Sequence, residues 1–179
     1  MTRRVLIAAG VLLAGTLGLG FGVGTRDEAV TPPVKEYRTV FLVRHGDTAP
    51  QPGEQDPKLT EEGEIRAARL AEVLRDEPLG SVFVTRTTRS MQTGTPTAEY
   101  NGIEPTVYPP TGYDEIKSMI NGQPSGTSCL VVAHSNTVPG IVRAFGGREM
   151  AELPEKEFDR LIVFVLRGET LVRMVELRY

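Results

Sequence analysis

The stretch VFLVRHGDTAP, residues 40–50, joins an apolar run to a short polar motif. Residues 37–43 are almost continuously apolar, which is typical of a central strand in a parallel sheet that is buried on both faces. The predicted strand ends at Arg44 and His45, and His45 is one of only two histidines in the chain. Ligands of open α/β sheets bind beyond the carboxyl ends of the strands. The motif therefore marks a candidate site.

The second histidine, His134, has an equivalent position. It follows the buried run SCLVVA and is itself followed by Ser135, Asn136 and Thr137, which open a predicted helix. A helix N-terminus offers free amides and positive potential to an anion. We expect the two histidines to lie at one edge of the sheet, with this helix directed toward the same site.

Arginines complete the pattern. Arg86 and Arg89 follow the predicted strand SVFVT and precede a helix, and Arg44 stands beside the first histidine. A guanidinium group matches two oxygens of a tetrahedral oxyanion, most simply phosphate. We expect one of Arg86 and Arg89 to reach the site and the other to be a solvated helix end. Gly46 is expected to let the backbone approach a ligand closely.

The rest of residues 37–179 alternates strand and helix patterns. A helix is expected after Thr60, a good N-cap, with Ala67, Leu70, Ala71 and Leu74 as its buried stripe. Further strands and helices are predicted at 81–85, 89–100, 106–108, 113–120, 128–133 and after His134, and a β-hairpin at 160–177. The fold class is α/β, a three-layer sandwich whose mostly parallel central sheet is flanked by helices and ends in a C-terminal β-hairpin.

The N-terminal part has a different character. Residues 5–24 are uncharged and apolar, and Arg3 and Arg4 precede them. Residues 1–25 are therefore expected to be a signal peptide or an N-terminal membrane anchor, and both alternatives stay open. Residues 26–36 read as a linker. In either case the folded part is expected outside the cytoplasm, as a secreted, periplasmic or outer-face membrane-anchored domain.

Composition excludes several classes of function. The 179-residue chain has a formal net charge of −3 and no basic run, which argues against nucleic acid as a partner. Its single cysteine, Cys129, can form no internal disulfide and is expected to be buried. The sequence shows no cluster of metal ligands, so neither a metal nor a cofactor is expected.

The run LVRHGDT resembles the signature of the histidine phosphatase superfamily, also called the phosphoglycerate mutase-like family. LTEEGEIRAARL, VTRTTRSMQT and VVAHSN are similar to further segments of that family, in its order. The chain lacks the larger insertions of the mutases and phytases and so resembles the small bacterial members. The resemblance implies that His45 is a nucleophile that forms a phosphohistidine, and that Arg44, Arg89 and His134 bind the phosphoryl oxygens. Contacts to the substrate are expected from Gly46, Asp47, Thr48, Ser135 and Asn136.

The resemblance does not identify the general acid. Asp47, Glu104, Asp114 and Glu115 are all candidates, because the family's acid often lies between the second arginine and the second histidine. The expected function is a metal-independent phosphohydrolase acting on a phosphorylated small molecule or a phosphoprotein. A non-catalytic module that binds a phosphorylated ligand is the alternative, followed by a phosphomutase or phosphotransferase.

Overall fold

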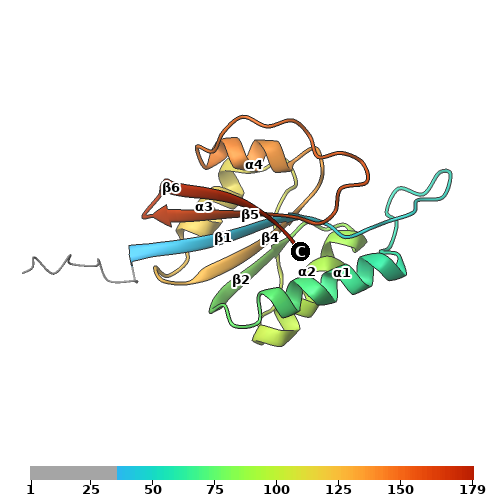
Figure 1. Cartoon of the computed structure of the whole chain (residues 1–179), viewed down its shortest axis with the longest axis horizontal. Helices are drawn as coiled ribbons and strands as arrows, with labels where there is room; N and C mark the ends of the chain where they lie inside the picture. Colours follow the sequence, from blue (N-terminus) through green and yellow to red (C-terminus); the bar gives the residue numbers. More distant parts are fainter. Residues whose placement is uncertain (1–35) are drawn as a thin grey trace, which may run out of the picture. The chain divides into compact units, whose positions relative to one another are not determined.

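The structure is a computed structural model that describes residues 36–179 (Figure 1). The expected signal peptide or anchor at 1–25, and the linker at 26–36 apart from its last residue, lie outside the described residues. Within residues 36–179, no helix is both long enough and apolar enough to cross a membrane.

A single six-stranded sheet forms the centre of the described domain, in the order β3-β2-β4-β1-β5-β6. The strands are β1 (Tyr37–Arg44), β2 (Leu79–Val84), β3 (Thr106–Val107), β4 (Ser128–Ala133), β5 (Arg160–Arg167) and β6 (Thr170–Arg178). The first four strands are parallel to one another, and the hairpin of β5 and β6 adds an antiparallel edge next to β1. The expected mixed sheet with a C-terminal hairpin is confirmed.

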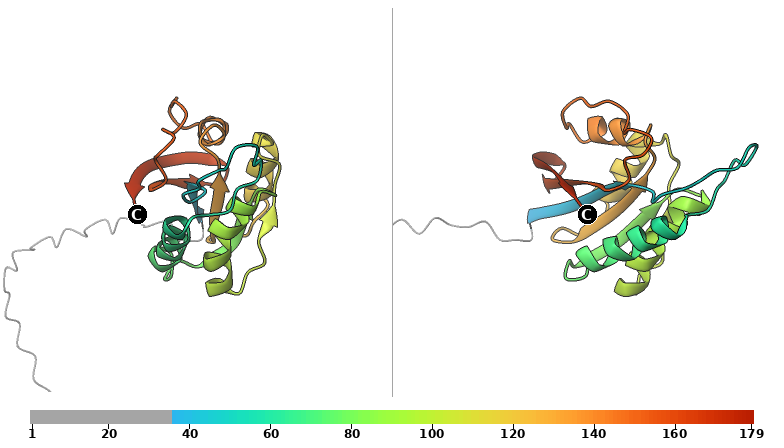
Figure 2. Two further views of the ribbon diagram at one scale, coloured as in Figure 1. Left: turned by 90° about the vertical axis from the view of Figure 1, so that its right-hand side faces the viewer. Right: turned by 45° about the vertical axis from the view of Figure 1, so that its right-hand side comes forward.

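Four helices cover the sheet: α1 (Glu61–Val73), α2 (Thr88–Asn101), α3 (Tyr113–Asn121) and α4 (Val138–Ala144). Figure 1 shows α1 and α2 on one face and α3 and α4 on the other, and Figure 2 shows the sheet between them. Successive side chains of a strand point to opposite faces. Val40 and Leu42 accordingly pack toward α3 and α4, whereas Phe41 and Val43 pack toward α1 and α2. The three-layer arrangement follows from this alternation.

Helix α1 forms as its sequence predicts. The Thr60 side chain accepts a hydrogen bond from the Gly63 amide, which satisfies one of the free donors of the first turn. All four residues of the expected apolar stripe are buried. The helix ends at Val73, and β2 begins already at Leu79, two residues earlier than expected.

Helix α2 continues through Gly94 and Pro96, two residue types that disfavour the interior of a helix. A Cβ atom on Gly94 would lie 2.7 Å from Cγ1 of Val84 in β2. The glycine therefore lets the helix backbone approach the sheet more closely than any other residue would allow. This close approach matters for function, because the first turn of α2 carries Arg89.

Candidate active site

Three segments meet at the carboxyl edge of the parallel strands. His45 follows β1, His134 follows β4, and Arg89 lies in the first turn of α2, which follows β2. Strands β1 and β4 are neighbours in register, and the amide of His45 donates to the carbonyl oxygen of Ala133 at 3.0 Å. The imidazole centroids are 5.3 Å apart. The sequence prediction that the two histidines share one site agrees with this geometry.

A cavity of about 870 Å³ opens over these side chains. Its floor contains Arg44, His45, Arg89 and His134, and its walls come from the loops at this end of the sheet. The lining residues from the loops include Thr48, Pro50, Glu54, Gln55, Pro57, Pro110, Thr111, Ser135, Asn136, Glu152, Glu155, Lys156 and Phe158. One of these loops, directly after β1, projects beyond the end of the sheet (Figure 2).

The contacts of His45 fix which of its nitrogens can react. Nδ1 lies 2.8 Å from the carbonyl oxygen of Gly46, which can only accept, so the proton belongs on Nδ1. Nε2 therefore carries the lone pair, and the Nε–H group of Arg89 donates to it at 3.2 Å. Burial is the main cause that lowers the pKa of His45 to about 3; the hydrogen bond to the Gly46 carbonyl opposes it, and the nearby His134, Arg89 and Arg44 add to it. The ring is thus a neutral imidazole with an available lone pair at Nε2.

His134 is also held neutral. Burial, together with the charges of Arg89 and Arg44, lowers its pKa to about 4. Its Nε2 lies 2.9 Å from Oγ1 of Thr85, and its backbone amide donates to Oγ1 of Thr137 at 3.0 Å. The Thr85 contact orients the ring from the β2 side, and the Thr137 contact holds the backbone of His134 ahead of α4.

We expect neither histidine to take up a proton between roughly pH 5.5 and pH 8, although an unperturbed histidine titrates near 6.5. Proton NMR of the imidazole C2 protons tests this directly. The chain contains two histidines, so an untagged protein gives two such signals, which His45→Ala and His134→Ala assign. Both signals should keep constant chemical shifts over this range.

The lowered pKa values of the two histidines also predict how the free energy of unfolding depends on pH. The unfolded chain protonates both histidines below about pH 6.5, whereas the folded chain does not, so the unfolded state binds more protons. The free energy of unfolding should therefore fall as the pH falls from about 6.5 toward 4. A midpoint near 6.5 for either histidine in the folded protein would contradict this account of the site.

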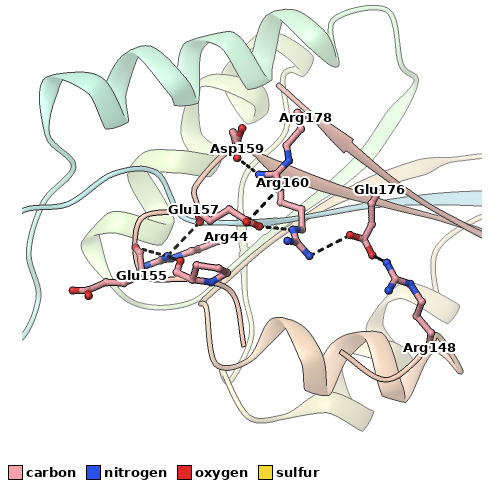
Figure 3. Close-up of polar contacts among 9 residues, drawn as sticks. Arg44, Arg148, Glu155, Glu157, Asp159, Arg160, Glu176 and Arg178 are labelled. Carbon is pink, nitrogen blue, oxygen red and sulfur yellow. Dashed lines mark hydrogen bonds and ion pairs between the residues drawn. The ribbon is translucent and has the colours of Figure 1, made fainter. Parts of the chain in front are cut away.

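Arg44 is anchored by backbone oxygens. Its Nη1 donates to the carbonyls of Pro154, Glu155 and Glu157 at 3.0, 2.8 and 3.3 Å (Figure 3). The guanidinium carbon lies 4.0 Å from the centroid of the Phe158 ring, a cation–π contact. Nε of Arg44 is buried and has no hydrogen-bond partner among the described residues. Nη1 thus holds the guanidinium group in place, and Arg44 also lines the cavity.

Arg89, rather than Arg86, reaches the site. Its Nη1 lies 3.4 Å from Oδ1 of Asp56, a residue of the loop after β1. The Asp56 carboxylate also accepts from the amide and the hydroxyl of Thr88, at 2.9 and 2.6 Å, and so caps α2. Hydrogen bonding from Thr88 lowers the pKa of Asp56. Arg86 is exposed and lines a separate cavity of about 460 Å³ with Glu115.

Of the five residues expected to contact substrate, Thr48, Ser135 and Asn136 line the cavity, and Gly46 and Asp47 do not. The Asp47 carboxylate pairs instead with Nε of Arg66 at 2.6 Å. The Gly46 amide donates to Oγ1 of Thr93 at 2.9 Å. Gly46 was expected to let the backbone approach a ligand closely, and this expectation is corrected. Its close approach is to the protein backbone, because a Cβ atom on Gly46 would lie 2.9 Å from the Gly63 carbonyl oxygen.

Gly63→Ala tests this backbone contact. A methyl group at Gly63 would overlap the carbonyl oxygen of Asp47 in the segment that follows His45. The clash is with backbone, which yields less than a side chain, so overpacking of about 3 kcal/mol should exceed the gain of about 1 kcal/mol in helix propensity. We expect a net loss of about 2 kcal/mol in urea unfolding. Arg69→Ala, exposed on the same helix, should change stability by less than about 0.5 kcal/mol, and a stabilised Gly63→Ala would refute the argument.

The structure moves the search for a general acid to other loops. Glu104, Asp114 and Glu115 do not line the cavity that contains His45. The carboxylates that do line it are Glu54, Glu152 and Glu155. They lie outside the interval between Arg89 and His134 that the family resemblance favoured. The sequence indicates these carboxylates only through their position. The loop after β1 and the segment between α4 and β5, which carry them, both adjoin the carboxyl edge of the parallel strands.

No group of three or more His, Cys, Asp or Glu side chains within residues 36–179 is placed to hold a metal ion. Cys129 is fully enclosed in β4, as expected, and burial raises the pKa of its thiol to about 12. It therefore takes no part in the site.

The site contains two neutral histidines and two arginines at the carboxyl edge of an α/β sheet. Such a set of side chains suits an enzyme that acts on phosphoryl groups. Comparison with protein families gives the same result: the model described as histidine phosphatase superfamily (branch 1) matches residues 40–110, which include Arg44, His45 and Arg89. The resemblance of the signature segments to the histidine phosphatase superfamily is confirmed over these residues. The expected class of enzyme, a phosphatase of this superfamily, is thereby confirmed.

Solved structures confirm the fold. The protein histidine phosphatase SixA complexed with tungstate is 19% identical, with a TM-score of 0.63 over 78% of this chain and 96% of that one. A mycobacterial glucosyl-3-phosphoglycerate phosphatase is 13% identical, with a TM-score of 0.59 over 80% and 98%. A putative phosphohistidine phosphatase SixA from Agrobacterium tumefaciens is 22% identical, with a TM-score of 0.52 over 76% and 96%. Among curated protein sequences, none matches this chain significantly.

Proposed function

We propose that this chain is a phosphohydrolase that works without a metal ion, through a phosphohistidine on His45. The observation that carries the proposal is the lone pair on Nε2 of His45, which lies in the cavity between Arg89 and His134. A buried neutral imidazole is a nucleophile at neutral pH, and guanidinium groups can supply the positive charge that phosphoryl transfer requires.

The reaction then takes two steps. Nε2 attacks phosphorus, a P–N bond forms, and the bond from phosphorus to the leaving group breaks, with a proton passing to that group. The Gly46 carbonyl accepts a hydrogen bond from Nδ1–H throughout and so stabilises the positive ring of the phosphohistidine. Water then attacks phosphorus, the P–N bond breaks with its electron pair returning to Nε2, a proton of the water passes to the group that served as the acid or to solvent, and phosphate leaves. Arg44, Arg89 and His134 bind the phosphoryl oxygens in both steps.

Two kinds of phosphorylated substrate are candidates, as the names of two similar structures suggest. One relative is described as a protein histidine phosphatase and another as a phosphatase of a small sugar phosphate. Phosphoramidates and activated aryl esters have good leaving groups and need little help from an acid, whereas alkyl phosphates need a proton donor. The carboxylates of Glu54, Glu152 and Glu155 are the candidates for that donor, since they line the cavity.

A substrate panel tests the proposal. The full chain, purified in a mild detergent, is incubated with an aryl phosphate, alkyl and sugar phosphates and a phosphohistidine peptide, with and without a chelator. We expect hydrolysis that the chelator does not change. Binding of inorganic phosphate without any turnover would instead support a non-catalytic module. Transfer to an added alcohol or sugar, in preference to water, would support a phosphotransferase.

We also propose that the domain works outside the cytoplasm, supported by the apolar residues 5–24 and the preceding Arg3 and Arg4. An alkaline phosphatase reporter, fused through a linker to the C-terminus of the His45→Ala variant, tests the location without interference from the chain's own activity. Activity of this reporter supports an external domain. A fused fluorescent protein that is fluorescent only in the cytoplasm would contradict the external location.

A further inference from the structure

The backbone segment that anchors Arg44 has little regular structure of its own. Residues 145–159 connect α4 to β5, and three carbonyls of residues 154–157 face a single guanidinium nitrogen. Near its middle, the segment is fixed because Leu153 is buried and its amide donates to the Ser135 carbonyl at 3.2 Å. Beyond Leu153, the Glu157 amide donates to the Pro154 carbonyl and the Tyr179 amide donates to the Asp159 carbonyl, and a side-chain tether to the hairpin adds to these backbone bonds.

Glu157 provides that tether. Its carboxylate binds Nε of Arg160, at the start of β5, and lies 3.3 Å from Nη2 of Arg178, near the end of β6 (Figure 3). Arg160 and Arg178 are cross-strand partners in the hairpin register, so both strands of the hairpin hold this one carboxylate. Only 16% of the Glu157 side chain is exposed, and hydrogen bonding to Arg160 lowers its pKa. The same residue thus offers its carbonyl to Arg44 and its carboxylate to the hairpin.

Each arginine of the hairpin also has a second carboxylate. Arg160 lies 3.2 Å from Glu176, and Arg178 pairs with Asp159. Glu176 additionally binds Arg148 (Figure 3). Loss of the Glu157 charge therefore leaves both arginines partnered and the hairpin intact, while residues 154–157 lose the ion pairs that Glu157 makes with the hairpin. This separation makes the role of Glu157 testable in a folded protein.

We propose that Glu157 is a positioning residue, which fixes the 154–157 carbonyls and through them the guanidinium of Arg44 in the phosphoryl site. The proposal rests on the proposed function, in which Arg44 binds a phosphoryl oxygen. A guanidinium held by Nη1 at three carbonyls is oriented before the ligand arrives, so binding costs less conformational entropy. Without the tether, the three carbonyls would hold Arg44 less firmly, and binding of phosphate would have to order it further.

The matched pair for the test is Glu157→Gln and Glu176→Gln. Each removes one carboxylate from Arg160, but only the first removes the ion pairs between the 154–157 segment and the hairpin. We expect Glu157→Gln to raise the inhibition constant of inorganic phosphate and the KM of an aryl phosphate by about tenfold, less than complete loss of a charge-assisted hydrogen bond would. Glu176→Gln should leave both values unchanged. Both variants should lose a similar, small amount of thermal stability.

A double-mutant cycle then separates positioning from general destabilisation. If Glu157 acts through Arg44, its replacement should have no further effect on kcat/KM in an Arg44→Ala background. Additive losses, or equal phosphate affinity in Glu157→Gln and Glu176→Gln, would overturn the proposal. A wild-type chain that neither binds phosphate nor hydrolyses the ester would overturn the proposed function instead, so the two failures are distinguishable.

Discussion

His45→Ala should lower kcat/KM for an aryl phosphate by about 10⁴-fold or more, because it removes the atom that forms the covalent bond. The loss should persist even with an excellent leaving group, since a better leaving group cannot replace an absent nucleophile. Steady-state kinetics measures it, and circular dichroism with thermal unfolding shows that the variant is folded. The buried His45 ring has two hydrogen-bonding contacts, at 2.8 and 3.2 Å, so alanine leaves a cavity but few unsatisfied partners.

The matched control is His134→Ala, in the neighbouring ring at 5.3 Å. It removes one partner of the phosphoryl oxygens, which costs about a hundredfold, so residual turnover should remain. Rapid acid quench of the wild type with a ³²P-labelled ester should trap label on the chain that is released on prolonged acid treatment but survives base, because a phosphoramidate is acid-labile. Label with the opposite stability, or wild-type turnover by His45→Ala, would exclude a phosphohistidine at this position.

Much of the site could be predicted because it depends on strand order. A buried strand that ends in a histidine places that residue at the carboxyl edge, and two such strands that pair in parallel bring their histidines together. The register of Arg44 opposite Ala133 puts His45 and His134 next to each other. Apolar periodicity likewise predicts which residues of α1 face the sheet. These features need only local pattern and the rule that parallel strands share an edge.

The loop contacts could not be predicted in this way. The carbonyls that hold Arg44 lie 110 residues or more along the chain, in a segment without periodicity. Asp56 caps a helix that begins 32 residues later. The side chain of the N-cap residue, Thr87, makes no capping hydrogen bond, and nothing in the local sequence indicates that Asp56 replaces it. The partner of Gly46 is another glycine, Gly63, whose helical position looks unfavourable from propensity alone. In each case the determining fact is where a loop or helix packs, which composition and spacing do not encode.

The second large effect is expected for Arg89→Ala, which should lower kcat/KM by about 10³-fold. Arg89 donates to Nε2 of His45 and lies in the cavity where the phosphoryl group would bind. Its removal therefore takes away both the orientation of the nucleophile and a positive charge in the transition state. The Asp56 carboxylate still accepts from the Thr88 amide and hydroxyl, so α2 keeps its cap and the variant should fold.

Arg86→Ala is the matched control, since Arg86 lies three residues earlier, is exposed and lines a separate cavity. It should keep nearly wild-type turnover. Arg89→Lys should recover only part of the loss, because an ammonium group supplies charge without the planar fork that reaches both the ring and a phosphoryl oxygen. Millimolar guanidinium added to Arg89→Ala should restore activity partially, and added ammonium should restore less. If Arg86→Ala is the more damaging change, or if Arg89→Lys retains full activity, then the transition state is not stabilised by an Arg89 guanidinium that contacts both the His45 ring and a phosphoryl oxygen.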